Sequence, residues 1–279
     1  LQTSGQKGEC EIFKALKDED IQFRNTALQM AEKVAGKAIY SRVAQKIDQF
    51  SIPAQTDVVR WLGNNRQQGL VDVIVKKMND DNKELASAAI KAGTQIGGDQ
   101  VLKAIIGLLG GRYGEESFKA LGSFAGDINS TVVGALDTEG TSAQEKLLQL
   151  VAKRKMSQAY PKVIRLLGSE NTNVKNAAYD ALGEISTFDH FDSLCDKMEK
   201  ADGQMREKLQ KAALYALHLQ NADVQYAAID KRMNASSAPQ LYDAMLAQAG
   251  NQQAIARLVK EYRQSSAQQE AFDALLKVE

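Results

Sequence analysis

The sequence predicts an all-α fold, a right-handed α-α superhelix of about nine helix pairs. Two patterns carry this prediction. A five-residue motif recurs nine times at steps of 28 to 35 residues, and such periods are typical of helical-repeat proteins. Apolar residues at i, i+3, i+4 and i+7, the spacing of one helix face, recur roughly half a period before the motif. Each repeat therefore contains an A helix followed by a B helix.

The five-residue motif marks the B helices. Its first, second and fifth positions are apolar and its fourth is usually small, so the third position should face solvent. The copies begin at Ala27, Val58, Ala89, Ser117, Leu147, Ala178, Ala213, Leu241 and Ala271.

The apolar series marks the A helices. Its full copies begin at Tyr40, Val71, Leu102, Tyr160, Phe191 and Ile255, and partial copies lie near Ile12, Val132 and Tyr226. Polar turns such as residues 79–82 and 169–173 separate A from B, because Asn, Asp, Ser and Thr cap helix starts. The three prolines also lie near expected helix starts.

These signals place one repeat array over residues 9–279, after a flexible N-terminal lead over residues 1–8. The expected helix pairs lie near 9–36, 38–66, 69–97, 99–126, 127–156, 158–187, 188–220, 222–249 and 251–279. Residues 93–126 contain nine glycines, which indicate either a hinge in the superhelix or tight helix crossings with short turns.

Composition excludes several classes of protein. The chain has 35 basic and 35 acidic residues, whereas a general nucleic-acid binder needs a cationic surplus. No run of 18 apolar residues could span a membrane. Two cysteines cannot form a disulfide framework. We expect a folded protein that binds no nucleic acid.

The third position of the motif is the candidate binding stripe, because the B helices of solenoids line the concave face. It begins at Gln29 and continues through Arg60, Lys91, Lys119, Gln149, Asp180, Tyr215, Asp243 and Asp273. Cations precede carboxylates along this stripe. We expect it to bind an extended segment of opposite polarity, although an ordinary solvated face would also explain it.

Catalytic and cofactor motifs are missing from the sequence, which has no H-E-x-x-H, no G-x-S-x-G and no phosphate-binding loop. We therefore expect no enzyme activity and no cofactor. One weak metal candidate combines His190 and His218 with Asp189 and Asp192, because the start of an A helix and the end of its B helix share one edge. The carboxylates could instead cap the helix start.

Residues 173–185, from Asn173 through Leu182-Gly183 to Ile185, resemble the B helix of a HEAT repeat, with Lys175 where Arg is commoner. The resemblance extends over most of the chain and implies an armadillo-like α-solenoid. Gln- and Ser-rich loops and residues 242–250 are similar to HEAT regions of exported Bacteroidota proteins, which often precede a 3-keto-disaccharide hydrolase-type domain. That resemblance implies a periplasmic or secreted location.

Two functions remain open from the sequence. The first is a non-catalytic scaffold that binds a protein or extended peptide along its B helices. The second is an accessory region of a larger exported carbohydrate-active enzyme, with catalysis in a covalently linked domain after residue 279. The last motif has no polar capping helix behind it, which favours a further domain there.

Overall fold

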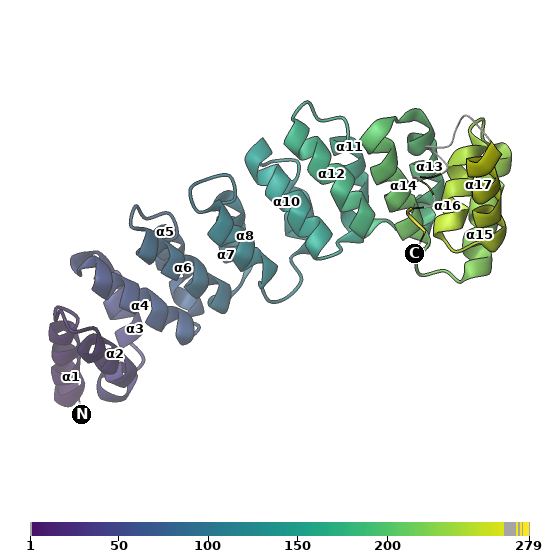
Figure 1. The fold of residues 1–279 in the computed structure, drawn as a ribbon. Helices are drawn as coiled ribbons and strands as arrows, with labels where there is room; N and C mark the ends of the chain where they lie inside the picture. Colours follow the sequence, from purple (N-terminus) through teal and green to yellow (C-terminus); the bar gives the residue numbers. More distant parts are fainter. Residues whose placement is uncertain (1, 265–271, 273, 275, 279) are drawn as a thin grey trace. The chain divides into compact units, whose positions relative to one another are not determined.

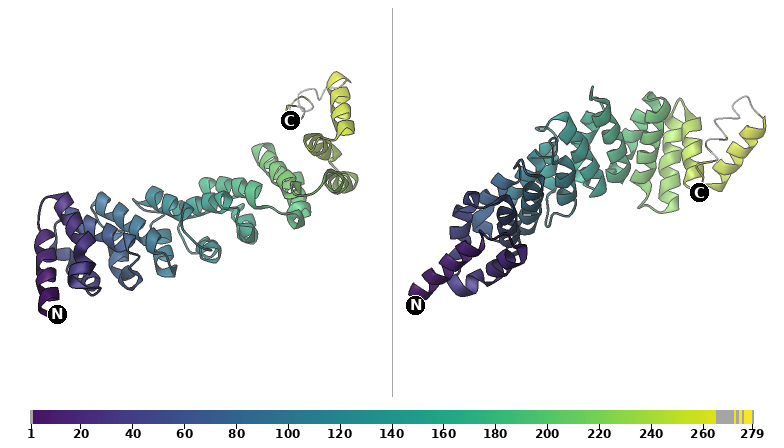
Figure 2. Two further views of the ribbon diagram at one scale, coloured as in Figure 1. Left: turned by 90° about the horizontal axis from the view of Figure 1, so that it is seen from below. Right: turned by 60° about the vertical axis from the view of Figure 1, so that its left-hand side comes forward.

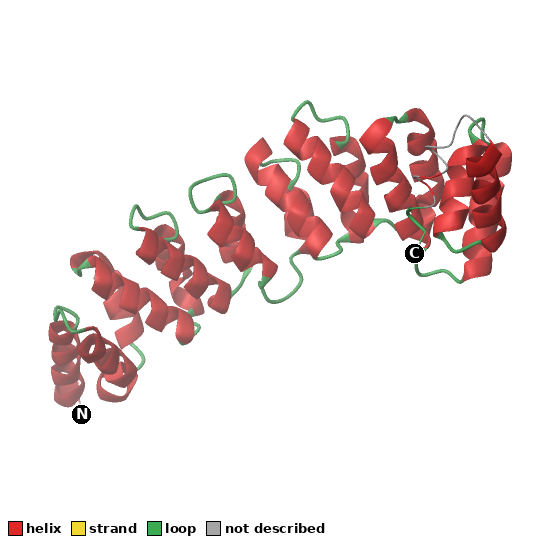
Figure 3. Cartoon of the chain, in the orientation of Figure 1, coloured by secondary structure: helices red, strands yellow, loops and turns green. Residues whose placement is uncertain are grey.

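The computed structural model describes residues 2–264, 272, 274 and 276–278. Within these residues all regular secondary structure is helical, with 17 α-helices and four short 3-10 helices (Figure 3). The predicted all-α fold of stacked helix pairs is confirmed. None of the described helices is both long and apolar enough to cross a membrane.

A and B helices alternate along the chain (Figure 1). The first five pairs are α1 (Gln2–Ala15) with α2 (Ile21–Ala35), α3 (Ile39–Gln45) with α4 (Ile52–Asn64), α5 (Val71–Lys77) with α6 (Lys83–Ile96), α7 (Asp99–Gly107) with α8 (Gly114–Gly122), and α9 (Asn129–Ala135) with α10 (Thr141–Lys153). Then follow α11 (Tyr160–Leu166) with α12 (Thr172–Ile185), α13 (Phe191–Lys200) with α14 (Gly203–Leu217), α15 (Ala222–Ala235) with α16 (Pro239–Gln248), and α17 (Gln252–Gln264).

Two pairs differ from the expected boundaries. Helix α1 begins at Gln2, so residues 2–8 are helical, whereas a flexible lead was expected over residues 1–8. The B helix expected in the ninth pair falls largely on residues 265–271, 273, 275 and 279, outside the described part of the chain. The short 3-10 helices η1 (Ile47–Gln49), η2 (Gln68–Leu70), η3 (Ser157–Ala159) and η4 (Phe188–His190) flank A helices.

The chain divides into two compact units, Leu1–Leu150 and Val151–Glu279. One repeat array over residues 9–279 stays a prediction. Within the first unit, the B helices α2, α4, α6 and α8 pack side by side in chain order (Figure 2). Within the second, α12 packs on α14. The B helices of the first unit therefore form a layer.

Helix starts use the polar turns identified in the sequence. The side chain of Asp20 accepts from the backbone N–H of Gln22 at 2.7 Å, and Asn82 and Asn171 cap α6 and α12 in the same way. Such caps each stabilise a helix by about 1 kcal/mol. Pro53, Pro161 and Pro239 occupy the first turns of α4, α11 and α16, as expected.

The core consists of the apolar faces that the two sequence patterns mark. Leu28, Val58 and Leu62 from B helices are fully or almost fully buried, as are Ile74 and Ile105 from A helices. Small residues allow close stacking of the B helices. A Cβ added at Gly63 of α4 would lie 2.5 Å from the Ala92 Cβ of α6, so these two helices touch backbone to backbone.

Glycines between residues 93 and 126 serve both turns and tight packing. Gly97 and Gly98 connect α6 to α7 with φ of 78° and 92°, a region that favours glycine. A Cβ at Gly93 would lie 2.3 Å from Met78 Cε. These positions agree with tight crossings and short turns, the second of the two explanations for the glycine density.

Candidate binding groove

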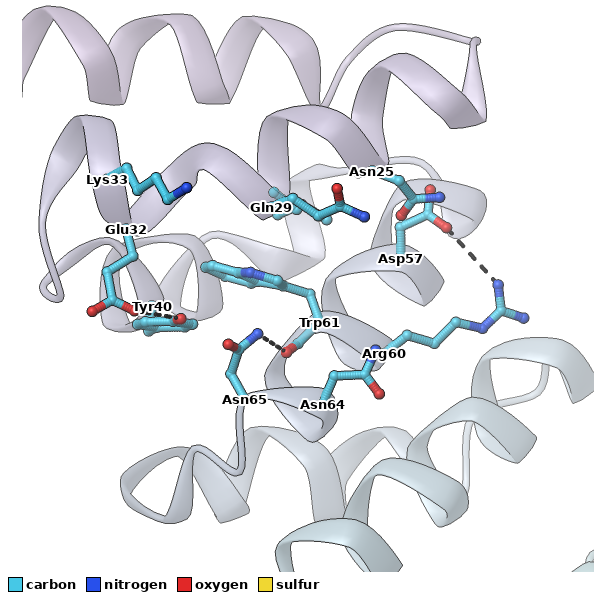
Figure 4. A pocket seen from close by; sticks show the side chains of 11 residues that line it. Asn25, Gln29, Glu32, Lys33, Tyr40, Asp57, Arg60, Trp61, Asn64 and Asn65 are labelled. Atoms are coloured by element: carbon cyan, nitrogen blue, oxygen red, sulfur yellow. Dashed lines mark hydrogen bonds and ion pairs between the residues drawn. The ribbon is translucent and has the colours of Figure 1, made fainter.

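Three adjoining hollows run along the B helices of the first unit, and we call them together the B-helix groove. The first lies between α2 and α4, with a volume of about 780 Å³ (Figure 4). The second lies between α4 and α6, at about 320 Å³, and the third between α6 and α8, at about 490 Å³. Arg60 and Asn64 line both the first and the second, and Ser87, Lys91 and Gln95 line both the second and the third. The hollows therefore form one continuous surface.

The N-terminal half of the predicted stripe lines this groove. Gln29, Arg60, Lys91 and Lys119 come from α2, α4, α6 and α8, one from each B helix. Each occupies the third position of its motif, so the expectation that this position faces outward holds here. Gln149 is also exposed, on α10, where its amide lies 3.5 Å from Glu145 Oε1.

Ion pairs neutralise most carboxylates of the groove. Glu84 pairs with Arg60 at 3.0 Å, Glu116 with Lys83 at 3.6 Å, and Asp57 with Arg24 at 2.7 Å. Arg60 also lies 3.9 Å from Asp57, and a dashed line marks this ion pair in Figure 4. These pairs leave the cations of the groove in excess of its free carboxylates.

Three lysines of the groove supply the excess positive charge. Within the described residues, no carboxylate lies within 4.0 Å of the ammonium groups of Lys33, Lys91 or Lys119. Among the described carboxylates that line the groove, only Glu32 lacks a cation as a partner. It accepts a hydrogen bond from Tyr40 Oη at 2.9 Å. The unpaired charge of the groove is therefore mainly positive, although the whole chain is neutral.

Aromatic rings form one wall of the first hollow. The rings of Tyr40 and Trp61 stack with centroids 4.4 Å apart and an interplanar angle of 16°. Burial, helped by the hydrogen bond to Glu32, raises the pKa of Tyr40 to about 12. Sequence reasoning treated Trp61 only as the fourth residue of a weak motif copy. The signal that could have identified Trp61 is its large side chain at a motif position that usually holds a small residue.

The C-terminal half of the stripe behaves differently. Asp180 pairs with Lys208 at 2.7 Å, and Asp243 pairs with Arg257 at 2.6 Å. The Tyr215 ring stacks on His218 at 4.2 Å. Asp273 lies outside the described residues. The carboxylates of Asp180 and Asp243 are therefore present on the stripe, but each is paired with a cation from a neighbouring helix.

The weak metal candidate is corrected. The His190 ring stacks on Tyr160 at 3.5 Å, and its Nδ1 accepts the backbone N–H of Thr187 at 3.0 Å. Burial lowers the pKa of His190. His218 contacts Tyr215 instead, through its ring and through Nδ1 to the carbonyl. Asp192 lies 4.0 Å from Arg232.

No group of three or more His, Cys, Asp or Glu in the described part of the chain is arranged to hold a metal ion. Asp189 lies in η4 and does not join the other three candidate ligands in such a group. Each imidazole is instead held by a neighbouring tyrosine.

The fold and groove define the class, an all-α helical-repeat protein. No protein-family model and no curated protein matches the chain. The complex of CpcE and CpcF of phycocyanin lyase from Nostoc sp. PCC7120 contains a similar chain, with 14% identity and a TM-score of 0.36, covering 84% of this chain and 92% of that one.

Two engineered proteins are also similar. One is 19% identical with a TM-score of 0.27, over 98% of this chain and 96% of its own. The other is 18% identical with a TM-score of 0.28, over 98% of each chain. The fold class rests on the helices described above. None of these comparisons supports the resemblance to exported Bacteroidota proteins.

Proposed function

We propose that this protein is a non-catalytic scaffold that binds a protein partner, through an extended peptide segment, along the B-helix groove of its first unit. The observation that carries the proposal is the continuity of the three hollows, which share lining residues from one B helix to the next. Such curved B-helix surfaces are the binding faces of helical-repeat proteins.

Amide side chains favour a polypeptide ligand. Asn25, Gln29, Asn64 and Gln95 line the groove across α2, α4 and α6. A carboxamide both donates and accepts hydrogen bonds, so it can pair with the N–H and the C=O of an extended main chain. Gln95 and Asn64 already lie 3.3 Å apart, which shows that amides of neighbouring repeats meet within the groove.

Charge favours an acidic ligand in the second and third hollows. Lys91 lines both, and Lys119 lines the third beside Ile90 and Ala120. Complementary charge raises the association rate and fixes the register of a bound segment. The groove therefore suits a peptide with acidic side chains interspersed with small or apolar ones.

Selection from a library of random displayed peptides tests this function. The selected peptides are labelled, and their affinities are measured for the wild type and for a groove variant carrying Arg60→Glu, Lys91→Glu and Lys119→Glu. A matched control carries Lys103→Glu, Lys200→Glu and Lys231→Glu, which change exposed lysines outside the groove by the same total charge.

We expect the groove variant to bind at least about tenfold more weakly, while the control binds as the wild type does. Equal affinity for the wild type and the groove variant would contradict the proposal, as would a selection that enriches no peptide.

A further inference from the structure

The first hollow of the groove contains a donor that the protein leaves unused. Trp61 is 7% exposed and its ring is held against Tyr40. The corresponding fourth motif position is alanine in α6 and α8, so only the first hollow has an indole as its wall. A stacked and mostly buried ring presents its N–H in a fixed direction.

The indole N–H of Trp61 has no acceptor among the described residues. The indole can only donate, and a buried indole N–H usually has a hydrogen-bond partner. Within the described residues, Nε1 is not among the enclosed polar atoms that lack a partner, so it is accessible, and the Trp61 side chain lines the first hollow. Figure 4 shows the ring in the middle of this hollow, with Lys33 and Gln29 on one side and Asn65 on the other.

The ionised groups around the indole are paired except for Lys33 and Glu32. Asp57 is paired with Arg24, Arg60 with Glu84, and Glu32 accepts from the Tyr40 hydroxyl. Lys33 has no carboxylate within 4.0 Å in the described structure. The hollow thus offers one unpaired ammonium and one unpaired N–H, both of which are donors.

We propose that the first hollow is a carboxylate site, in which the Trp61 Nε1–H and the Lys33 ammonium bind an acidic side chain of the peptide. The proposal rests on the proposed function and deepens it, because it assigns one acidic residue of the ligand to one place in the groove. The amides of Asn25 and Gln29 line the same hollow and can hold the adjoining main chain. An internal side chain suits the site because the groove continues beyond it along α4 and α6.

Trp61 is the only tryptophan in the chain, so its fluorescence reports on this hollow alone. The probes are three blocked peptides of equal length, acetylated and amidated, with alternating Glu-Ser, Gln-Ser or Lys-Ser sequences. We expect the Glu-Ser probe to change the Trp61 emission saturably, at concentrations at least about tenfold lower than the Gln-Ser probe requires. A preference for the Lys-Ser probe would overturn the proposal and would indicate a cation site formed by Glu32 and the rings.

Two variants test the donors by calorimetry with the Glu-Ser probe. Trp61→Phe keeps an aromatic ring against Tyr40 and removes the N–H, and Lys33→Gln removes the exposed ammonium. Each should weaken binding by about tenfold, whereas Lys103→Gln on α7 should leave it unchanged. Lys33→Gln is at the surface and should not impair folding, so it decides the question if Trp61→Phe unfolds.

The two proposals fail in distinguishable ways. If the selected peptides bind the wild type and lose affinity for the groove variant, but bind Trp61→Phe and Lys33→Gln unchanged, the carboxylate site is wrong and the groove function stands. If no peptide binds at all, both are wrong.

Discussion

The guanidinium of Arg24 and the carboxylate of Asp57 form a buried ion pair directly beneath the B-helix groove. Arg24 Nε lies 2.7 Å from Asp57 Oδ2, and the two side chains are 3% and 2% exposed. Arg24 also donates to the carbonyls of Asp18 and Glu19, at 2.9 and 2.8 Å. One arginine therefore ties the turn between α1 and α2, the start of α2 and the middle of α4 together, which positions the walls of the first hollow.

Asp57→Asn should destabilise the first unit by about 3–5 kcal/mol, because it leaves the Arg24 charge buried without a counter-charge. Denaturant unfolding followed by circular dichroism measures the loss. Glu84→Gln is the matched control, since it breaks the exposed pair with Arg60 and should cost less than about 1 kcal/mol. Equal effects of the two substitutions would contradict a structural role for the buried pair.

Gly63→Ala should destabilise the protein by about 1–3 kcal/mol, because the added Cβ would lie 2.5 Å from Ala92 Cβ and force α4 away from α6. Gly183→Ala is the control at the equivalent position of α12, directly after the motif, where an added Cβ meets nothing within 4 Å. That control should be neutral or stabilising by up to about 1 kcal/mol, since alanine favours helix. Thermal unfolding of both variants compares them, and a stabilising Gly63→Ala would show that the two helices do not approach so closely.

Tyr40 should make stability depend on alkaline pH. Burial and Glu32 raise its pKa to about 12 in the folded protein, above the ordinary value of 10.0. The unfolded chain therefore loses this proton first, so the stability that Tyr40 contributes is complete below pH 10 and is lost as the pH rises through about 12. Unfolding of the wild type at pH 8 and pH 11 should differ more than unfolding of Tyr40→Phe does. The same difference in both proteins would contradict the raised pKa.

The two cysteines should differ in reactivity. Cys10 is exposed, whereas Cys195 is buried in α13, and burial raises the pKa of its thiol to about 12. Because the thiolate is the reactive form, a disulfide reagent at pH 8 should modify Cys10 quickly and Cys195 only after unfolding. Cys10→Ser should abolish the fast reaction. A fast reaction that persists in this variant would place Cys195 at the surface.

Local patterns in the sequence were enough for much of the fold. Asn82 and Asn171 were expected to start helices, and they do so because capping depends on residues within one turn. Arg60, Lys91 and Lys119 were expected to point outward together. They line one groove because the same helical position faces the same way in every stacked repeat.

Features that depend on contacts between helices were beyond the sequence. Lys208 and Arg257 come from helices next to Asp180 and Asp243, and no spacing rule predicts such pairs. The stacking of Tyr40 on Trp61 likewise depends on how α3 meets α4. The candidate metal ligands do not come together, because the His190 ring stacks on the distant Tyr160 and the His218 ring stacks on Tyr215 of its own helix.

If a peptide ligand occupies the B-helix groove of the first unit, hydrogen–deuterium exchange in the presence of a selected peptide will locate it. We expect slower exchange in α2, α4, α6 and α8, with little change in α3, α5 and α7. Protection confined to the A helices, or to residues 151–264, would contradict it.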